Sequence, residues 1–84
     1  MEDQIETFLS ENEGWRIFID ETQGNLNNAT FNLVSVSNAI LRNRRITFDV
    51  KVNYNVFEEE HNTESRGVAT IDRNGNITGV ERSV

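Results

Sequence analysis

The sequence contains no cysteine and no proline, only five glycines, and a single lysine, Lys51. Without cysteine the chain forms no disulfide framework, no thiolate nucleophile and no cysteine-ligated metal site. No apolar run approaches the roughly 18 residues that a membrane-spanning helix needs, so we expect no membrane association. The amino terminus is acidic where a secretory signal carries positive charge, which predicts a cytoplasmic protein.

Positive charge is also scarce. Eight basic residues stand against fourteen acidic ones, which gives a formal net charge of −6. This is the wrong sign for a protein that binds a phosphate backbone, and we expect no direct nucleic-acid binding. Isoleucine, valine and threonine together make up 22 of the 84 residues, which favours strands over disorder.

The length fits a single domain, 1–84. A chain of this size buries only about 60% of the surface that its unfolded state exposes, so its core is modest. We therefore expect that a second subunit can complete the core, as in a homodimer.

One segment has helical periodicity. Ile5, Phe8 and Leu9 lie at positions i, i+3 and i+4, which predicts an amphipathic helix over residues 2–12. Gly14 is well placed to end it. The apolar stripe of this helix needs a surface to pack on.

Two strands are expected next. Residues 15–20 alternate, with Trp15 and two isoleucines on one side and Phe18 pointing outward on the polar side. From Phe31 to Leu41 the alternation changes parity, which predicts a bulge near residues 33 and 34.

The strongest pattern runs from Arg45 to Phe57. Six apolar side chains occupy every second position without a miss, and polar ones occupy the positions between. At about 3.3 Å per residue this strand spans some 40 Å, so it must curl around the core or project into a partner. The apolar set comprises Ile46, Phe48, Val50, Val52, Tyr54 and Val56.

The remaining residues predict an exposed acidic connection over 58–64 and a final hairpin with strands near 66–72 and 76–82. A three-residue loop with Gly75 in the left-handed conformation suits this hairpin. That register places Ile71 opposite Ile77 and Val68 opposite Val80.

The predicted fold is α+β, with one amino-terminal helix packed on a curled five-stranded antiparallel meander. In topology alone this is similar to the cystatin-like and nuclear-transport-factor-like architectures. The turn at 41–45 lacks the Gln-x-Val-x-Gly hairpin that cystatin inhibitors insert into proteases. Protease inhibition of that type is therefore not predicted.

Catalytic and cofactor motifs are missing: there is no Gly-x-Ser-x-Gly, no phosphate-binding glycine loop and no dinucleotide fingerprint. We predict no enzymatic activity, no cofactor and no metal site. Asp72, Asn74 and Asn76 resemble the start of a calcium loop, but the positions that require glycine and glutamate hold Ile77 and Ser83. A plain hairpin turn is the preferred interpretation.

Five residues are candidates for an interaction surface. Arg42, Arg44 and Arg45 gather positive charge at one turn, and guanidinium groups bind carboxylate or phosphate in bidentate fashion. Phe18 and Phe57 lie on otherwise polar faces, where aromatic side chains can anchor a partner.

These observations predict a small non-enzymatic protein-interaction module that binds another protein or a second copy of itself. One alternative is an acidic nucleic-acid mimic, suggested by the run of glutamates at 58–64. The other is a small-ligand pocket or weak enzyme in the hollow of the sheet, lined by Trp15, Phe48 and Tyr54. Asp20 and Asp49 are candidates for paired carboxylates, but both fall on the face predicted to be exposed.

Overall fold

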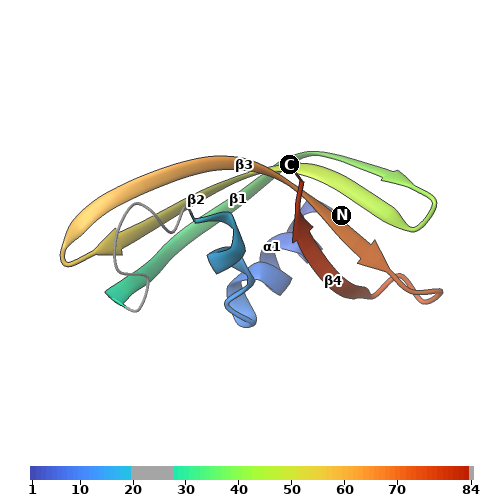
Figure 1. Cartoon of the computed structure of the whole chain (residues 1–84). Helices are drawn as coiled ribbons and strands as arrows, with labels where there is room; N and C mark the ends of the chain where they lie inside the picture. The colour runs from blue at the N-terminus through green and yellow to red at the C-terminus, as the bar shows by residue number, and fades with distance from the viewer. Residues whose placement is uncertain (20–27, 84) are drawn as a thin grey trace.

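The computed structural model describes residues 1–19 and 28–83, and in that part the chain forms two short helices and one antiparallel sheet (Figure 1). The four strands follow the chain order β1-β2-β3-β4. The α+β class and the meander are confirmed, but the described residues form four strands instead of five, and a cystatin-like or nuclear-transport-factor-like topology is not confirmed. The elements are α1 (Glu2–Glu11), the 3₁₀ helix η1 (Gly14–Phe18), β1 (Ala29–Arg42), β2 (Arg45–Val56), β3 (Glu59–Ile71) and β4 (Ile77–Arg82).

Helix α1 agrees with the periodicity of its sequence. Ile5 and Leu9 are completely buried, and Phe8 packs against the core from the edge. The helix ends at Glu11, and Gly14 begins η1 instead of capping α1. No helix in residues 1–19 or 28–83 combines the length and the apolar character needed to span a membrane.

The expected strand at 15–20 is wrong, because residues 14–18 form η1. A 3₁₀ helix has three residues per turn, so residues three apart share a face. Trp15 and Phe18 are both buried on that face, whereas Ile17 is 41% exposed. The spacing of Trp15 and Phe18, and not the alternation of Trp15 with the isoleucines, therefore describes this short segment. Asp20 lies outside the described residues.

Strand β2 is the centre of the fold, and its predicted alternation is confirmed: the six apolar side chains of one face are all buried. They face α1 and η1, over which the sheet arches (Figure 1). Phe18 meets Phe48 edge to face, with ring centroids 6.1 Å apart. Gly67 on β3 lies beneath both rings, so the core is closely packed at this point.

Strand β1 contains the predicted bulge, displaced by about one residue. The register with β2 shifts between Phe31 and Leu33, and shifts again between Ser37 and Ile40. Near the second shift Asn38 adopts a φ of 54°, a conformation that asparagine tolerates well. These irregularities keep apolar side chains of both parities on the buried face.

The predicted acidic connection at 58–64 is wrong, because β3 begins at Glu59 and pairs with β2 along its whole length. Only Phe57 and Glu58 form the turn, both with positive φ. The first half of β3 presents His61 and small polar residues to the concave face of the sheet. It therefore lacks the hydrophobic alternation that marks a strand. Pairing is nevertheless favoured, since otherwise β2 would leave its backbone groups unpaired along a buried sheet.

The last hairpin follows the predicted loop. Gly75 is left-handed with a φ of 84°, and Ile71 pairs with Ile77. A register shift after Thr70 then places Val80 opposite Ala69, so the predicted pairing of Val68 with Val80 is wrong. The shift directs Val80 toward the core.

Two carboxylates of α1 cover the edge of β1. Glu6 accepts a hydrogen bond from the backbone N–H of Val36 at 2.7 Å, and Glu2 accepts one from Ala39 at 3.3 Å. The two glutamates are four residues apart and lie on one helix face. They occupy N–H groups that an edge strand would otherwise offer to another chain.

Replacing Gly67 by alanine should lower the free energy of unfolding by about 1–3 kcal/mol, because it overpacks the core. A Cβ atom there would lie 2.6 Å from Phe48 and 2.8 Å from Phe18. Gly79→Ala is the matched control, since no atom lies within 4 Å of its new methyl group. Urea denaturation followed by tryptophan fluorescence measures both. Equal stability of the two variants would contradict this packing.

Glu6→Ala should cost about 1–2 kcal/mol of stability, because it leaves the Val36 N–H without its charged acceptor. Glu11→Ala removes an exposed glutamate from the same helix and should change stability little. Glu6→Gln keeps an acceptor oxygen and should restore part of the loss. Thermal denaturation by circular dichroism distinguishes the three variants, and indistinguishable midpoints for Glu6→Ala and Glu11→Ala would refute the edge-capping role.

Candidate functional site

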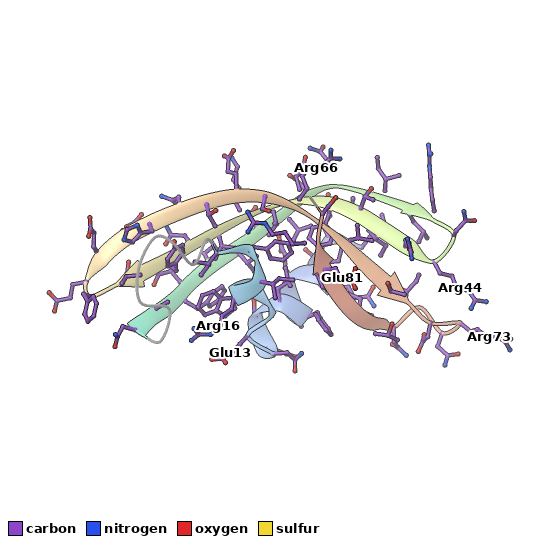
Figure 2. All side chains as sticks on the ribbon, in the orientation of Figure 1. Glu13, Arg16, Arg44, Arg66, Arg73 and Glu81 are labelled. Atoms are coloured by element: carbon purple, nitrogen blue, oxygen red, sulfur yellow. The ribbon has the colours of Figure 1, made fainter. Side chains whose placement is uncertain are left out.

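Two hairpins bring four arginines to one end of the sheet. Arg42, Arg44 and Arg45 belong to the β1–β2 turn, and Arg73 belongs to the β3–β4 loop. Figure 2 shows Arg44 and Arg73 projecting from the same end of the molecule. We call these four residues the arginine end.

The local backbone explains this arrangement. Asn43 and Arg44 both have positive φ, at 49° and 64°, which is the two-residue turn whose twist matches a β-hairpin. The N–H of Ile71 donates to the carbonyl of Arg44 at 3.0 Å, so the two hairpins are joined by their backbones.

The β3–β4 loop is held in place from two sides. Asp72 accepts the backbone N–H groups of Asn74 and Asn76, both at 2.9 Å. Gln4 of α1 donates to the carbonyl of Gly75 at 2.7 Å. These bonds are those of a hairpin turn, as the sequence predicted, and they present Arg73 to solvent.

The arginine end is exposed and carries uncompensated charge. None of its four side chains forms an ion pair with residues 1–19 or 28–83. By contrast, Lys51 pairs with Glu64, and Arg66 pairs with Asp49. Arg42 lies directly opposite Arg45 in the β1–β2 register, an unfavourable like-charge pair. A shallow depression of about 380 Å³ adjoins them, lined by Ile40, Arg42, Asn43, Arg45 and Thr47.

Sequence reasoning identified three of these arginines because they are neighbours in the chain. Arg73 was missed, because it joins them only through the register of β2 with β3, which pairs Arg45 with Thr70. The meander itself was a usable signal: in an antiparallel meander the first and third turns lie at the same end of the sheet.

The two candidate aromatic residues do not belong to the arginine end. Phe57 is 71% exposed at the β2–β3 turn, which lies at the opposite end of β2. The expectation that Phe18 points outward is wrong: its side chain is completely buried, because the 3₁₀ helix turns it toward Phe48. The five candidates therefore form no single cluster.

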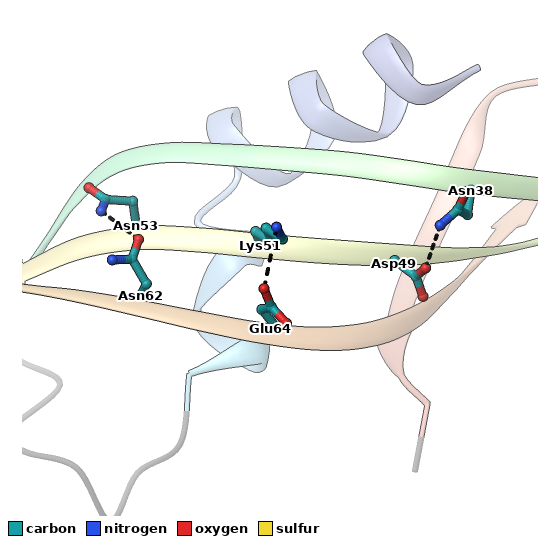
Figure 3. Close-up of polar contacts among 6 residues, drawn as sticks. All are labelled: Asn38, Asp49, Lys51, Asn53, Asn62 and Glu64. Atoms are coloured by element: carbon teal, nitrogen blue, oxygen red, sulfur yellow. Dashed lines mark hydrogen bonds and ion pairs between the residues drawn. The ribbon is translucent and has the colours of Figure 1, made fainter.

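The convex face of the sheet is polar and satisfies its own hydrogen bonds. Asn53 donates to Asn62 at 2.7 Å, and Asn38 donates to Asp49 at 2.8 Å (Figure 3). Between these two contacts, Lys51 Nζ lies 3.3 Å from a carboxylate oxygen of Glu64. Side chains that bind one another across strands stabilise the sheet and offer few free groups to a ligand.

The remaining candidates gain little from the structure. Trp15, Phe48 and Tyr54 are at most 3% exposed and belong to one core cluster, so the packing gives a ligand pocket among them no support. His61 stacks on Tyr54 at 5.4 Å. Asp49 binds Asn38 and Arg66 on the convex face. Within the described part of the chain no group of three or more histidine, aspartate or glutamate side chains could hold a metal ion.

A comparison of the chain with protein-family models, with curated proteins and with solved structures finds no match. The arginine end, with its four exposed guanidinium groups, is the candidate binding surface among the described residues.

Proposed function

We propose that the chain is a small non-enzymatic protein-interaction module, which binds an anionic protein surface in the cytoplasm through its arginine end. The observation that carries this proposal is the convergence of four exposed arginines, without ion pairs to the described residues, in a chain of net charge −6. Guanidinium groups bind carboxylates through paired, planar hydrogen bonds.

Electrostatics within the fold support this interpretation. Arg42 and Arg45 face each other across a strand pair, and Arg44 lies at the turn between them. This arrangement lowers the stability of the fold, because like charges repel. Fourteen acidic residues are present in the chain, yet no described carboxylate forms an ion pair with the cluster. An external carboxylate partner removes this repulsion on binding.

A protein partner is favoured over a nucleic acid. The arginine end is local and matches a small anionic patch, whereas a phosphate backbone extends beyond it and meets the rest of a chain whose net charge is −6. The alternative of nucleic-acid mimicry has less support, because β3 sends successive side chains of 59–64 to opposite faces of the sheet. Glu59 and Glu60 therefore do not form one phosphate-like row.

The binding proposal is tested with a fluorescein-labelled decaglutamate peptide and fluorescence anisotropy. The native chain should bind the peptide, and Arg42→Glu combined with Arg44→Glu should weaken binding about tenfold, since each exposed contact contributes up to about 1 kcal/mol. Added salt should weaken binding by the native chain as well.

Arg82→Glu is the control for charge. Arg82 is exposed, forms no ion pair with the described residues and ends β4 away from the arginine end. It should leave peptide affinity nearly unchanged. Equal losses in Arg82→Glu and Arg44→Glu would show that net charge, and not the arginine end, governs binding.

Stability should change in the opposite direction to binding. Arg42→Glu converts the like-charge pair with Arg45 into an attractive pair, and should raise the free energy of unfolding by about 0.5 kcal/mol. For a domain of this size that is a rise of roughly 2–4 °C in Tm. Scanning calorimetry measures it, with Arg82→Glu as the variant of equal net charge. A lower Tm for Arg42→Glu than for Arg82→Glu would contradict the proposed repulsion.

A further inference from the structure

The end of the molecule opposite the arginines has the complementary chemistry. The β2–β3 turn carries Phe57 and three consecutive glutamates, Glu58, Glu59 and Glu60, all exposed. We call these four residues the acidic end. Strand β2 runs from one end to the other, and the molecule is 41 Å long.

The carboxylates of the acidic end are only weakly engaged. Glu59 lies 3.9 Å from His61, a contact that is an ion pair only when the imidazole is protonated. Glu60 accepts a hydrogen bond from Asn53 at 3.0 Å, and Glu58 forms no ion pair within the described residues. Like the arginines, these groups lie at a solvated tip where a partner can approach without displacing the core.

The aromatic side chain adds shape to this charge complementarity. Phe57 is 71% exposed, and the depression at the arginine end has Ile40, itself 54% exposed, in its lining. An aromatic ring in that depression contacts apolar surface below and arginine side chains at the rim, where guanidinium groups stack on aromatic faces. Glutamates that flank Phe57 in the chain then come within reach of the remaining guanidinium groups.

From these observations we infer that the anionic partner of the arginine end is the acidic end of a second copy of the chain. This inference rests on the proposed function, because it names the partner of the same site. The two contacting surfaces differ, so the contact is heterologous, and because they lie at opposite ends of the long axis, two copies leave one end of each kind free. Association therefore continues head to tail into chains of increasing mass.

The contact involves two hairpin tips and is small, so it is weak and sensitive to salt. Analytical ultracentrifugation at low ionic strength should show a weight-average mass that rises steadily with concentration up to about 1 mM, the range of weak association. Added salt should return the chain to monomers. A strict monomer throughout, or a dimer whose mass stops rising, would overturn the inference.

Charge reversal makes the test specific. A chain with Arg42→Glu and Arg44→Glu no longer has a net positive arginine end, because two glutamates then stand beside Arg45 and Arg73, and a chain with Glu58→Arg and Glu59→Arg has two basic tips. Each should lose self-association at least tenfold, and an equimolar mixture of the two should regain it. Absence of association in the mixture would count against the tip-to-tip contact.

Two further variants separate charge from position. Arg82→Glu combined with Glu11→Arg alters two exposed charges outside the tips and should associate like the native chain. Phe57→Ser leaves every charge in place and should weaken association several-fold by removing the aromatic contact. Native-like association of Phe57→Ser would remove Phe57 from the contact.

The decaglutamate experiment distinguishes failure of the proposed function from failure of the inference about a second copy. If the native chain binds the peptide through Arg42 and Arg44 but stays monomeric, the proposed function stands and the inference about the second copy fails. If the peptide does not bind either, both fail.

Discussion

The burial of one face of β2 is the constraint on which the rest of the structure depends. Six apolar side chains at alternate positions require cover along a strand of twelve residues, about 40 Å when extended. Helix α1 has ten residues and a length of only about 15 Å, and η1 is shorter still. The helices therefore lie under the middle of the arch, and the hairpin tips project beyond them (Figure 1). A tip that contributes little to the core is free to carry charge, and both tips of this molecule do.

On the convex face, the surface between the two tips carries little unpaired charge. On the convex face asparagine side chains bind one another across the strands: Asn32 donates to Asn53 and Asn55, and Asn53 donates to Asn62. The charged groups of that face are mostly paired, as Lys51 is with Glu64 and Arg66 with Asp49. The edge of β1 is closed by carboxylates of α1. The asparagines and paired charges of this face therefore leave the two tips as the places where unpaired charges of one sign lie next to each other.

How far the sequence predicts this structure depends on whether local spacing decides the conformation. The alternation in β2 and the left-handed Gly75 determine their elements without help from distant residues, and both were predicted. Residues 15–19 offer two patterns, the alternation of Trp15 with two isoleucines and the 3₁₀ spacing of Trp15 with Phe18, and packing against Phe48 selects the second. The first half of β3 offers polar side chains to both faces, so its pairing follows from the open edge of β2 and not from its own composition. The same distinction applies to the arginine end. Arg42, Arg44 and Arg45 are close together in the sequence, whereas Arg73 is brought beside them only by the strand register.

The position of the charges also determines which encounters between molecules are productive. Two like ends repel each other, and a side-by-side approach meets a β1 edge whose N–H groups at Val36 and Ala39 are already occupied. Strand β4 leaves the first half of the β3 edge uncovered, and Glu60 and Glu64 lie on this half. A second copy of β3 that paired there with its glutamates opposite these two would be repelled. An approach along the long axis with unlike ends facing is the one that gains Coulomb energy at both tips while leaving the core undisturbed. A partner of any other kind must match the same geometry: carboxylates spaced to meet two hairpin tips, with an apolar group positioned near Ile40.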